Sequence, residues 1–519
     1  MKIDIKKICV AVLAMCMVTA CDLDTSPTVS LDASGVYKDT KNAERVLRGV
    51  WNYVFNEGLS YASLGYGTIM LSDDFAGSDA VRTLSYGLSA SYNLTNGYSR
   101  GEHCRALWDL MYDPINNCNA ILKHIDDVSG SKEEKDRIKG QTYASRAFMY
   151  LVLASHYSFA IDKDPDAVCV PIYTEPTDYN QAVNGQPAAS VSEVYAQVLS
   201  DLKNALELIP ENYSHGNDAT KQYQIDHLAL GLMARASLYA RHWDDAYKYA
   251  TAALAINPYL MNEEEYKSGF NDYTNKEWMW SLSCTIDDND PCYLFYFKDC
   301  TPESGGYTSL NTDPYFKEKL DDTDYRKDLF NWGQTAYQDW ALLNNKFRFK
   351  DIENMLGDIV MMRTSEMYLI KAEAAAHIAG KESEAQQTLQ IMRDARTKAG
   401  MKARTVTETG EALIKEIWME RRRELWGEGF SLVDIIRNQQ PVERKEDNGI
   451  ATKPDGTPIL DKDGKTIPVK GHTITSLPDK TDFVPNSIYY LLRIPEKEEL
   501  QNPVLYSKHP KLPEYVLEK

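Results

Sequence analysis

The chain has 519 residues, 43% of them hydrophobic, and a formal net charge of −19. This length is ample for a large core, and the acidic charge argues against nucleic acid as a partner, because phosphates attract lysine and arginine. The 33 tyrosines and 9 tryptophans are more informative, since aromatic rings suit both helix packing and stacking on sugars.

The start of the chain has the pattern of a secretory signal. A basic stretch precedes an apolar run at residues 8–18, which is shorter than the roughly 20 residues that a membrane-spanning helix needs. Small residues then precede Cys21, as in a bacterial lipobox, where the cysteine is lipidated on its sulfur and amine. We therefore predict a signal peptide at residues 1–20 and a lipidated, flexible tether at residues 21–34, which anchors the protein to a membrane.

Helical periodicity dominates the rest of the chain, which we expect to form one domain over residues 35–519. Residues 43–54, 108–125 and 141–159 each place apolar side chains on one face at helical spacing. Small residues in the third segment let a neighbouring helix approach closely.

Helical pairs then recur along the chain. Residues 225–258 resemble a tetratricopeptide repeat. The positions in register are Ala234, Ala246, Ala253 and Pro258. Residues 190–210 resemble half of another repeat, opened by a Ser-x-x-Glu capping box, and residues 362–400 give a third helical pair. We expect a mainly α fold: a tetratricopeptide-like scaffold over about 140–260 and 360–437, with a few short strands.

Two long segments lack helical periodicity, residues 59–100 and residues 262–350. Both are rich in aromatic residues, which argues against disorder, and long irregular stretches in a compact protein are usually functional. Residues 292–297 have the composition of a strand, and Trp278 and Trp280 alternate as in a strand, which places at least one of them in the core.

Turn signals and cysteines complete the pattern. Asp-Gly pairs at residues 455–456 and 463–464 indicate a small hairpin insertion within residues 448–480. No CxxC pair is present, so a zinc ribbon or redox motif is not expected. The clustered residues Cys284, Cys292 and Cys300 permit one disulfide, and buried free thiols fit them equally well.

Signatures of catalysis are missing from the sequence, which contains no nucleophile elbow, phosphate-binding loop or zinc-protease helix motif. We therefore expect no enzyme activity, no cofactor and no metal. The charged segment at residues 420–424 is interpreted as a salt-bridge network that fixes helix packing, because no nucleophile or base accompanies it. A pair of carboxylates serving glycoside hydrolysis is the enzymatic alternative.

Six segments in chain order resemble the SusD/RagB family of outer-membrane nutrient-uptake lipoproteins. The most specific is the motif "ER..EL..EG….D..R". The matching residues include Trp108, Tyr112, Asn119, Arg146, Tyr150, Asp324, Arg326, Glu420, Arg421, Glu424, Glu428, Asp434, Ile494, Pro495 and Asn502. The sequence departs from the family pattern at Gly427, Ser431 and Arg493.

The resemblance implies a helical-repeat fold and a function. Members of this family resemble lids on a TonB-dependent, SusC-like barrel, and they capture an oligosaccharide at the cell surface and deliver it chemically unaltered. The implied partners are a glycan, the transporter and, through the lipid anchor, the outer membrane. The alternatives are a lid for peptide or other nutrient uptake, a glycoside hydrolase, and an adaptor that binds only protein.

The shared motifs of the family do not contain ligand residues, so our candidates come from the two irregular segments. A sugar face stacks on tyrosine or tryptophan, and its hydroxyls need polar partners such as asparagine. The candidates from the first segment are Tyr86, Tyr92, Asn93, Asn96 and Tyr98, and those from the second are Tyr296, Tyr307, Asn311 and Trp332. For each of them, packing on the scaffold is the alternative.

Overall fold

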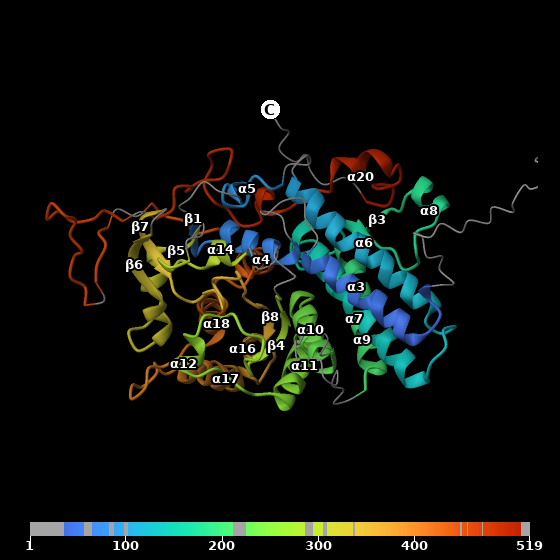
Figure 1. Ribbon diagram of the computed structural model, residues 1–519, viewed down its shortest axis with the longest axis horizontal. Coiled ribbons are helices and arrows are strands. Elements are labelled where there is room, and N and C mark those ends of the chain that lie inside the picture. Colours follow the sequence, from blue (N-terminus) through green and yellow to red (C-terminus); the bar gives the residue numbers. More distant parts are fainter. Residues whose placement is uncertain are drawn as a thin grey trace, which may run out of the picture.

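The computed structural model describes residues 36–56, 65–82, 88–97, 102–210, 225–285, 294–304, 309–335, 338–446, 449–453, 455–469 and 471–509. Helices make up about half of this part of the chain, and the strands form short two-stranded sheets that are spread across the molecule (Figure 1). Among the described helices, none combines the length and the apolar character that crossing a bilayer requires. The predicted signal peptide, Cys21 and the tether lie outside the described residues.

Long helices form the N-terminal half of the scaffold. They are α3 (Thr40–Asn56), α6 (Glu102–His124), α7 (Lys132–Tyr157) and α9 (Val191–Leu208). The predicted helices are confirmed, although α7 begins earlier than its apolar pattern suggested, at a capping box on Ser131. The predicted capping box of α9 is also present, because Ser190 Oγ accepts a hydrogen bond from the Glu193 amide at 3.2 Å.

Stacked helical hairpins form the rest of the scaffold. They are α10 (Ile225–Tyr239) with α11 (Trp243–Ile256), and α16 (Thr364–His377) with α17 (Glu382–Ala395), followed by α18 (Gly410–Glu424). Helix α11 packs on α10 and α16, and Ala246 and Ala253 are fully buried where these helices touch. Small side chains therefore allow the close stacking that the sequence predicted.

The first irregular segment contains two helices, α4 (Gly65–Ala76) and the short α5 (Ser89–Tyr92), that were not predicted from the sequence. Helix α4 is buried on nearly all sides. Its sequence therefore lacks the alternation of polar and apolar faces by which a helix is recognised. Its acids are paired inside the protein: Asp73 Oδ2 lies 3.0 Å from His156 Nε2, and Asp74 Oδ2 accepts from the Gly429 amide at 2.9 Å. The segment continues through β1 (Ala80–Arg82) and α5.

Short antiparallel pairs form the sheets. They are β1 with β5 (Leu310–Thr312), β2 (Val168–Pro171) with β3 (Ala188–Ser190), β4 (Trp278–Leu282) with β8 (Ile359–Arg363), and β6 (Phe330–Thr335) with β7 (Gln338–Asn344). Trp278 and Trp280 on β4 are both buried, which confirms the expectation for this pair. Trp280 packs edge-on against Trp51 of α3 and Phe148 of α7, with ring centroids 5.0 and 4.9 Å apart.

The strand predicted near residue 295 is wrong, because residues 295–298 form the short helix α14 (Phe295–Lys298). Asn344 Nδ2 donates to the carbonyl oxygens of Lys298 and Leu310 at 3.0 and 2.7 Å. A side chain of β7 thus satisfies backbone acceptors that a strand ladder would otherwise have satisfied. Cys300 is a buried free thiol, Cys284 is also buried, and Cys292 lies outside the described residues.

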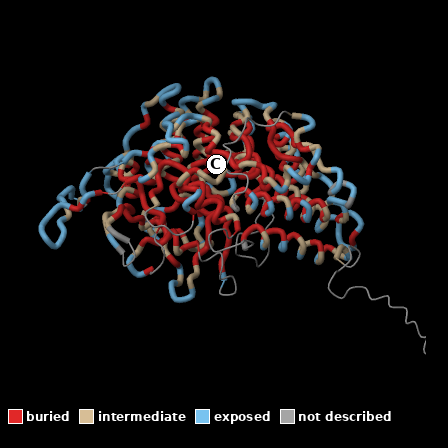
Figure 2. Tube along the Cα trace, turned by 90° about the horizontal axis from the view of Figure 1, so that it is seen from above, coloured by how far each residue is buried: buried red, intermediate tan, exposed pale blue. Residues whose placement is uncertain are grey.

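Short elements complete the fold. They are α8 (Tyr179–Asn184), α12 (Glu263–Tyr266), α15 (Pro314–Glu318), η1 (Tyr325–Leu329), α19 (Ser431–Arg437), η2 (Ile488–Tyr490) and α20 (Glu496–Gln501). The predicted hairpin insertion is present as a meander of isolated bridges, including Leu460 with Thr466. In Figure 2 the buried residues run through the body of the molecule and exposed residues surround them.

Gly429, which follows α18, is expected to tolerate no side chain. Its φ is +83°, and a Cβ there would lie 2.5 Å from Met70 Cβ in α4, whereas Gly456 in the insertion has φ +80° and open space. Gly429→Ala should therefore lower the free energy of unfolding by about 1–3 kcal/mol more than Gly456→Ala. Urea denaturation of both variants measures the difference, and equal midpoints would contradict the close packing of α4.

Candidate functional site

The two irregular, aromatic-rich segments meet in the structure. Strand β1 of the first segment pairs with β5 of the second, with Val81 opposite Asn311. Helix α5 follows β1, and β7 packs beside β5, so these elements lie in the half of the molecule away from α3 and α9 (Figure 1). The structure therefore joins the two regions that the sequence singled out for ligand binding.

Tyr92 and Asn311 turn inward and cannot serve as predicted. Tyr92 is 1% exposed, its hydroxyl lies 3.0 Å from His472 Nδ1, and the Arg444 guanidinium lies 4.7 Å from its ring centroid. Asn311 is fully buried within β5. A buried tyrosine ring has no open face on which a sugar could stack, and a buried carboxamide does not reach a sugar hydroxyl. Neither residue therefore belongs to the site. Burial also raises the pKa of the Tyr92 hydroxyl.

Four of the predicted site residues are half-buried in this half of the molecule. Asn93 and Asn96 follow α5, and the Asn96 amide donates to Ser91 Oγ at 2.8 Å. Tyr296 on α14 donates its hydroxyl to Met355 Sδ at 2.7 Å. Trp332 lies on β6 opposite Leu342. These four residues come from three different elements. Tyr86, Tyr98 and Tyr307 lie outside the described residues.

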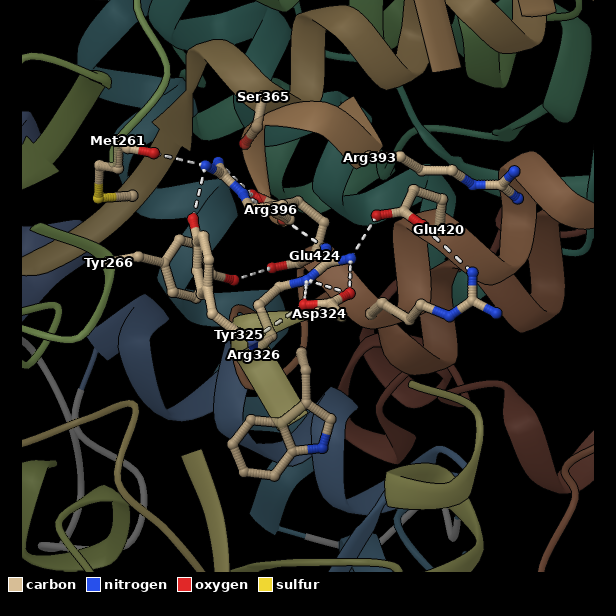
Figure 3. Close-up of polar contacts among 12 residues, drawn as sticks. Met261, Tyr266, Asp324, Tyr325, Arg326, Ser365, Arg393, Arg396, Glu420 and Glu424 are labelled. Carbon is tan, nitrogen blue, oxygen red and sulfur yellow. Dashed lines mark hydrogen bonds and ion pairs between the residues drawn. The ribbon is translucent and has the colours of Figure 1, made fainter. Parts of the chain in front are cut away.

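A buried charge network occupies the scaffold below these strands. Glu424 at the end of α18 is fully buried and contacts three guanidinium groups, those of Arg326, Arg363 and Arg396, at 2.7, 2.5 and 2.8 Å. Figure 3 shows Glu424 with Arg326 and Arg396. Burial alone would raise the pKa of Glu424, but the three arginines outweigh it and hold that pKa well below its usual range.

Further charged side chains extend the network, and they keep its negative and positive charges in balance. The additional carboxylates are Glu277, Asp324, Glu420 and Glu428, and the additional cations are Lys346 and, at the edge, Arg423. Glu420 and Arg423 lie on α18 and Glu428 follows it, Asp324 precedes η1, Glu277 precedes β4, and Lys346 follows β7. The network therefore ties the helical repeats to the strands, which confirms the interpretation of residues 420–424 as structural.

Chemistry that would alter a ligand is not evident in the part of the chain that the structure describes. The carboxylates of the charge network are paired with arginine and lysine side chains. Outside the network, burial raises the pKa of Asp74 to about 8 and that of Asp313 to about 7. No group of three or more histidine, cysteine or acidic residues in these ranges could hold a metal ion. A polar cleft of about 340 Å³ borders the network near Arg393 and Arg404, but no aromatic ring lines it. The described features thus define a rigid helical-repeat protein with an aromatic-bearing loop region.

Comparisons with known proteins identify the family. A family model described as the SusD family matches residues 330–511, and one described as starch-binding associating with outer membrane matches residues 58–238. A crystal structure of a SusD-like carbohydrate binding protein from Bacteroides vulgatus is 45% identical, with a TM-score of 0.86, and the match covers 92% of this chain and all of that one. This chain therefore belongs to the SusD family, as its motifs predicted.

Two further relatives show how far the likeness extends. A SusD-like protein of Formosa agariphila is 23% identical over 390 residues, which are 65% of this chain and 72% of that protein. A laminarin binding SusD-like protein is 18% identical with a TM-score of 0.66, and the match covers 90% of this chain and 98% of that one. The helical, tetratricopeptide-like fold expected from the sequence is confirmed.

Proposed function

We propose that this protein captures a glycan at the cell surface and delivers it, chemically unaltered, to a TonB-dependent, SusC-like transporter of the outer membrane. The pairing of β1 with β5 carries the proposal, because it brings two aromatic-rich segments together in a member of the SusD family. The 45% identical relative is named as a carbohydrate binding protein, and one family model is named for starch binding at the outer membrane.

The proposed contact surface is built around Trp332 and Tyr296, with Asn93 and Asn96 as hydrogen-bonding partners. The rings are half-buried, so each keeps part of its surface open while the protein holds it in place. A ring held in this way loses little side-chain entropy when a sugar stacks on it. Tyr86, Tyr98 and Tyr307 lie outside the described residues and remain candidates from the sequence alone.

Anchoring at the outer membrane completes the proposal. The acyl chains on Cys21 would hold the protein at the leaflet, and residues 22–34 would let the body reach the transporter. Copurification of the transporter with the protein from native membranes tests this partnership, and recovery of the protein alone would count against it.

Trp332→Ala is expected to weaken glycan binding about tenfold, which is ~1.4 kcal/mol, because it removes a stacking face. Calorimetric titration with laminarin and with soluble starch measures the affinity. Trp243→Ala is the matched control, since Trp243 is half-buried on α11 against His377, far from β6. Equal losses in both variants would remove Trp332 from the site. Shortened laminarin chains after incubation would overturn the proposal of binding without chemistry.

A further inference from the structure

A second cleft lies along α18 and α19, apart from the surface proposed above. Its volume is about 240 Å³, which is below the roughly 300–1,000 Å³ of ordinary ligand pockets, so it suits one sugar unit better than a large ligand. Trp418 of α18 forms part of its wall with the apolar side chains of Met419, Ile435 and Pro441. From the sequence alone, Trp418 cannot be distinguished from an ordinary core residue.

Trp418 is fixed as a platform. Its indole N–H donates to Glu373 Oε1 at 3.1 Å, and Glu373 is held in turn by Arg437 Nη1 at 2.5 Å. The ring is half-buried, so the protein fixes its orientation and leaves part of the ring at the cleft. A preoriented aromatic wall is the feature that a sugar ring requires, because its C–H face packs on the ring without ordering a mobile side chain.

The polar lining suits a neutral, hydroxyl-rich ligand. The charged groups are two cations, Lys415 and Arg422, and two acids, Asp434 and Glu443, so the cleft favours neither an anion nor a cation. Donors and acceptors thus lie side by side, as sugar hydroxyls need, since each hydroxyl both donates and accepts.

Asn438 provides an independent indication of a ligand. It lines the cleft directly after α19 and is 7% exposed. Its side-chain oxygen has no hydrogen-bond partner among the residues that the structure describes. A buried acceptor without a partner is costly, and Asn438 belongs to the cleft wall, so a small rotation of its carboxamide would let a sugar hydroxyl donate to this oxygen.

We propose that the cleft between α18 and α19 is a second glycan site, which binds one neutral sugar unit between the Trp418 ring and the Asn438 carboxamide. The inference rests on the proposed capture of glycan and adds a contact outside the β1–β5 region. Ser78, which lines the cleft, lies two residues before β1, so the cleft adjoins the start of that strand.

Fluorine NMR of the full mature chain labelled with 5-fluorotryptophan tests the site directly. The Trp418 signal is identified by its loss in Trp418→Phe, and maltoheptaose, laminarin oligosaccharides and galactan, mannan and xylan fragments are titrated separately. We expect at least one glycan to shift the Trp418 signal saturably. The Trp243 signal should stay in place, because that ring stacks on His377 in another helical pair.

Variants of Asn438 separate a ligand contact from a structural role. Asn438→Ala should raise the half-saturating glycan concentration about tenfold, whereas Asn438→Asp keeps an acceptor oxygen and should retain the shift. A shift at Trp332 with none at Trp418 would overturn the second site and leave the proposed function standing. A shift at Trp418 alone would support the cleft and overturn the loop surface. No shift at any tryptophan with any of the glycans would overturn both.

Discussion

Glu424→Gln is expected to lower the free energy of unfolding by about 3–5 kcal/mol. Glutamine preserves the size of the side chain, so the change removes charge and not volume. In the native protein Glu424 is fully buried between Arg326, Arg363 and Arg396. Loss of the carboxylate leaves their positive charge undercompensated in a region that water does not reach, and the remaining acids of the network are already engaged.

Chemical denaturation measures the effect, and the same helix supplies the control. Glu411 at the start of α18 pairs with Lys415 one turn later, but its side chain is 79% exposed. Glu411→Gln should therefore leave the denaturation midpoint unchanged, because water screens and replaces the lost pair. If the two variants unfold at the same midpoint, the network is not what holds the repeats to the strands.

Cys21→Ala is expected to abolish lipidation and, with it, attachment to the outer membrane. The lipid is proposed to be attached to this sulfur and to the amine that signal cleavage frees, so alanine removes the acceptor. Several acyl chains bind a bilayer stably, whereas the polar tether that follows has no apolar run to replace them. Growth with an alkyne analogue of palmitate, followed by fluorescent tagging and fractionation, measures both labelling and location.

Cys16→Ala provides the matched control. Cys16 lies within the apolar run of the predicted signal, so its loss should leave the mature protein labelled and membrane-bound. Lipid labelling that persists in Cys21→Ala would refute the predicted processing site. Labelling that is lost in both variants would show that the substitutions act on export and not on the acceptor.

Several helices of the scaffold, α9, α11 and α17 among them, could be predicted because they bury only one face. In α11, for example, Ala246, Ala250 and Ala253 are buried while intervening positions meet water, and this contrast is visible as a period. Helix α4 offers no such contrast. Its Asp73 and Asp74 look like loop residues in the sequence, and their partners His156 and Gly429 lie far along the chain.

The candidate site was harder to predict because local sequence does not say which way an aromatic ring turns. Tyr92 and Trp332 have similar neighbours in the sequence, where small and polar residues flank both, yet only Tyr92 is buried in the structure. Its hydroxyl meets His472, about 380 residues away, and only the folded chain reveals that contact. Trp418 was missed for the opposite reason, since its helical spacing is that of a core residue while its ring borders a cleft.

Strands β1 and β5 are each only three residues long, yet they connect parts of the chain about 230 residues apart. Closing so large a loop costs entropy that three pairs of residues do not repay unless their surroundings are already in place. We therefore expect the helical hairpins to assemble first and this pairing to follow late. A polypeptide whose synthesis stops early would then have folded helices but no paired β1 and β5. The proposed glycan-binding surface would therefore form only in the complete chain.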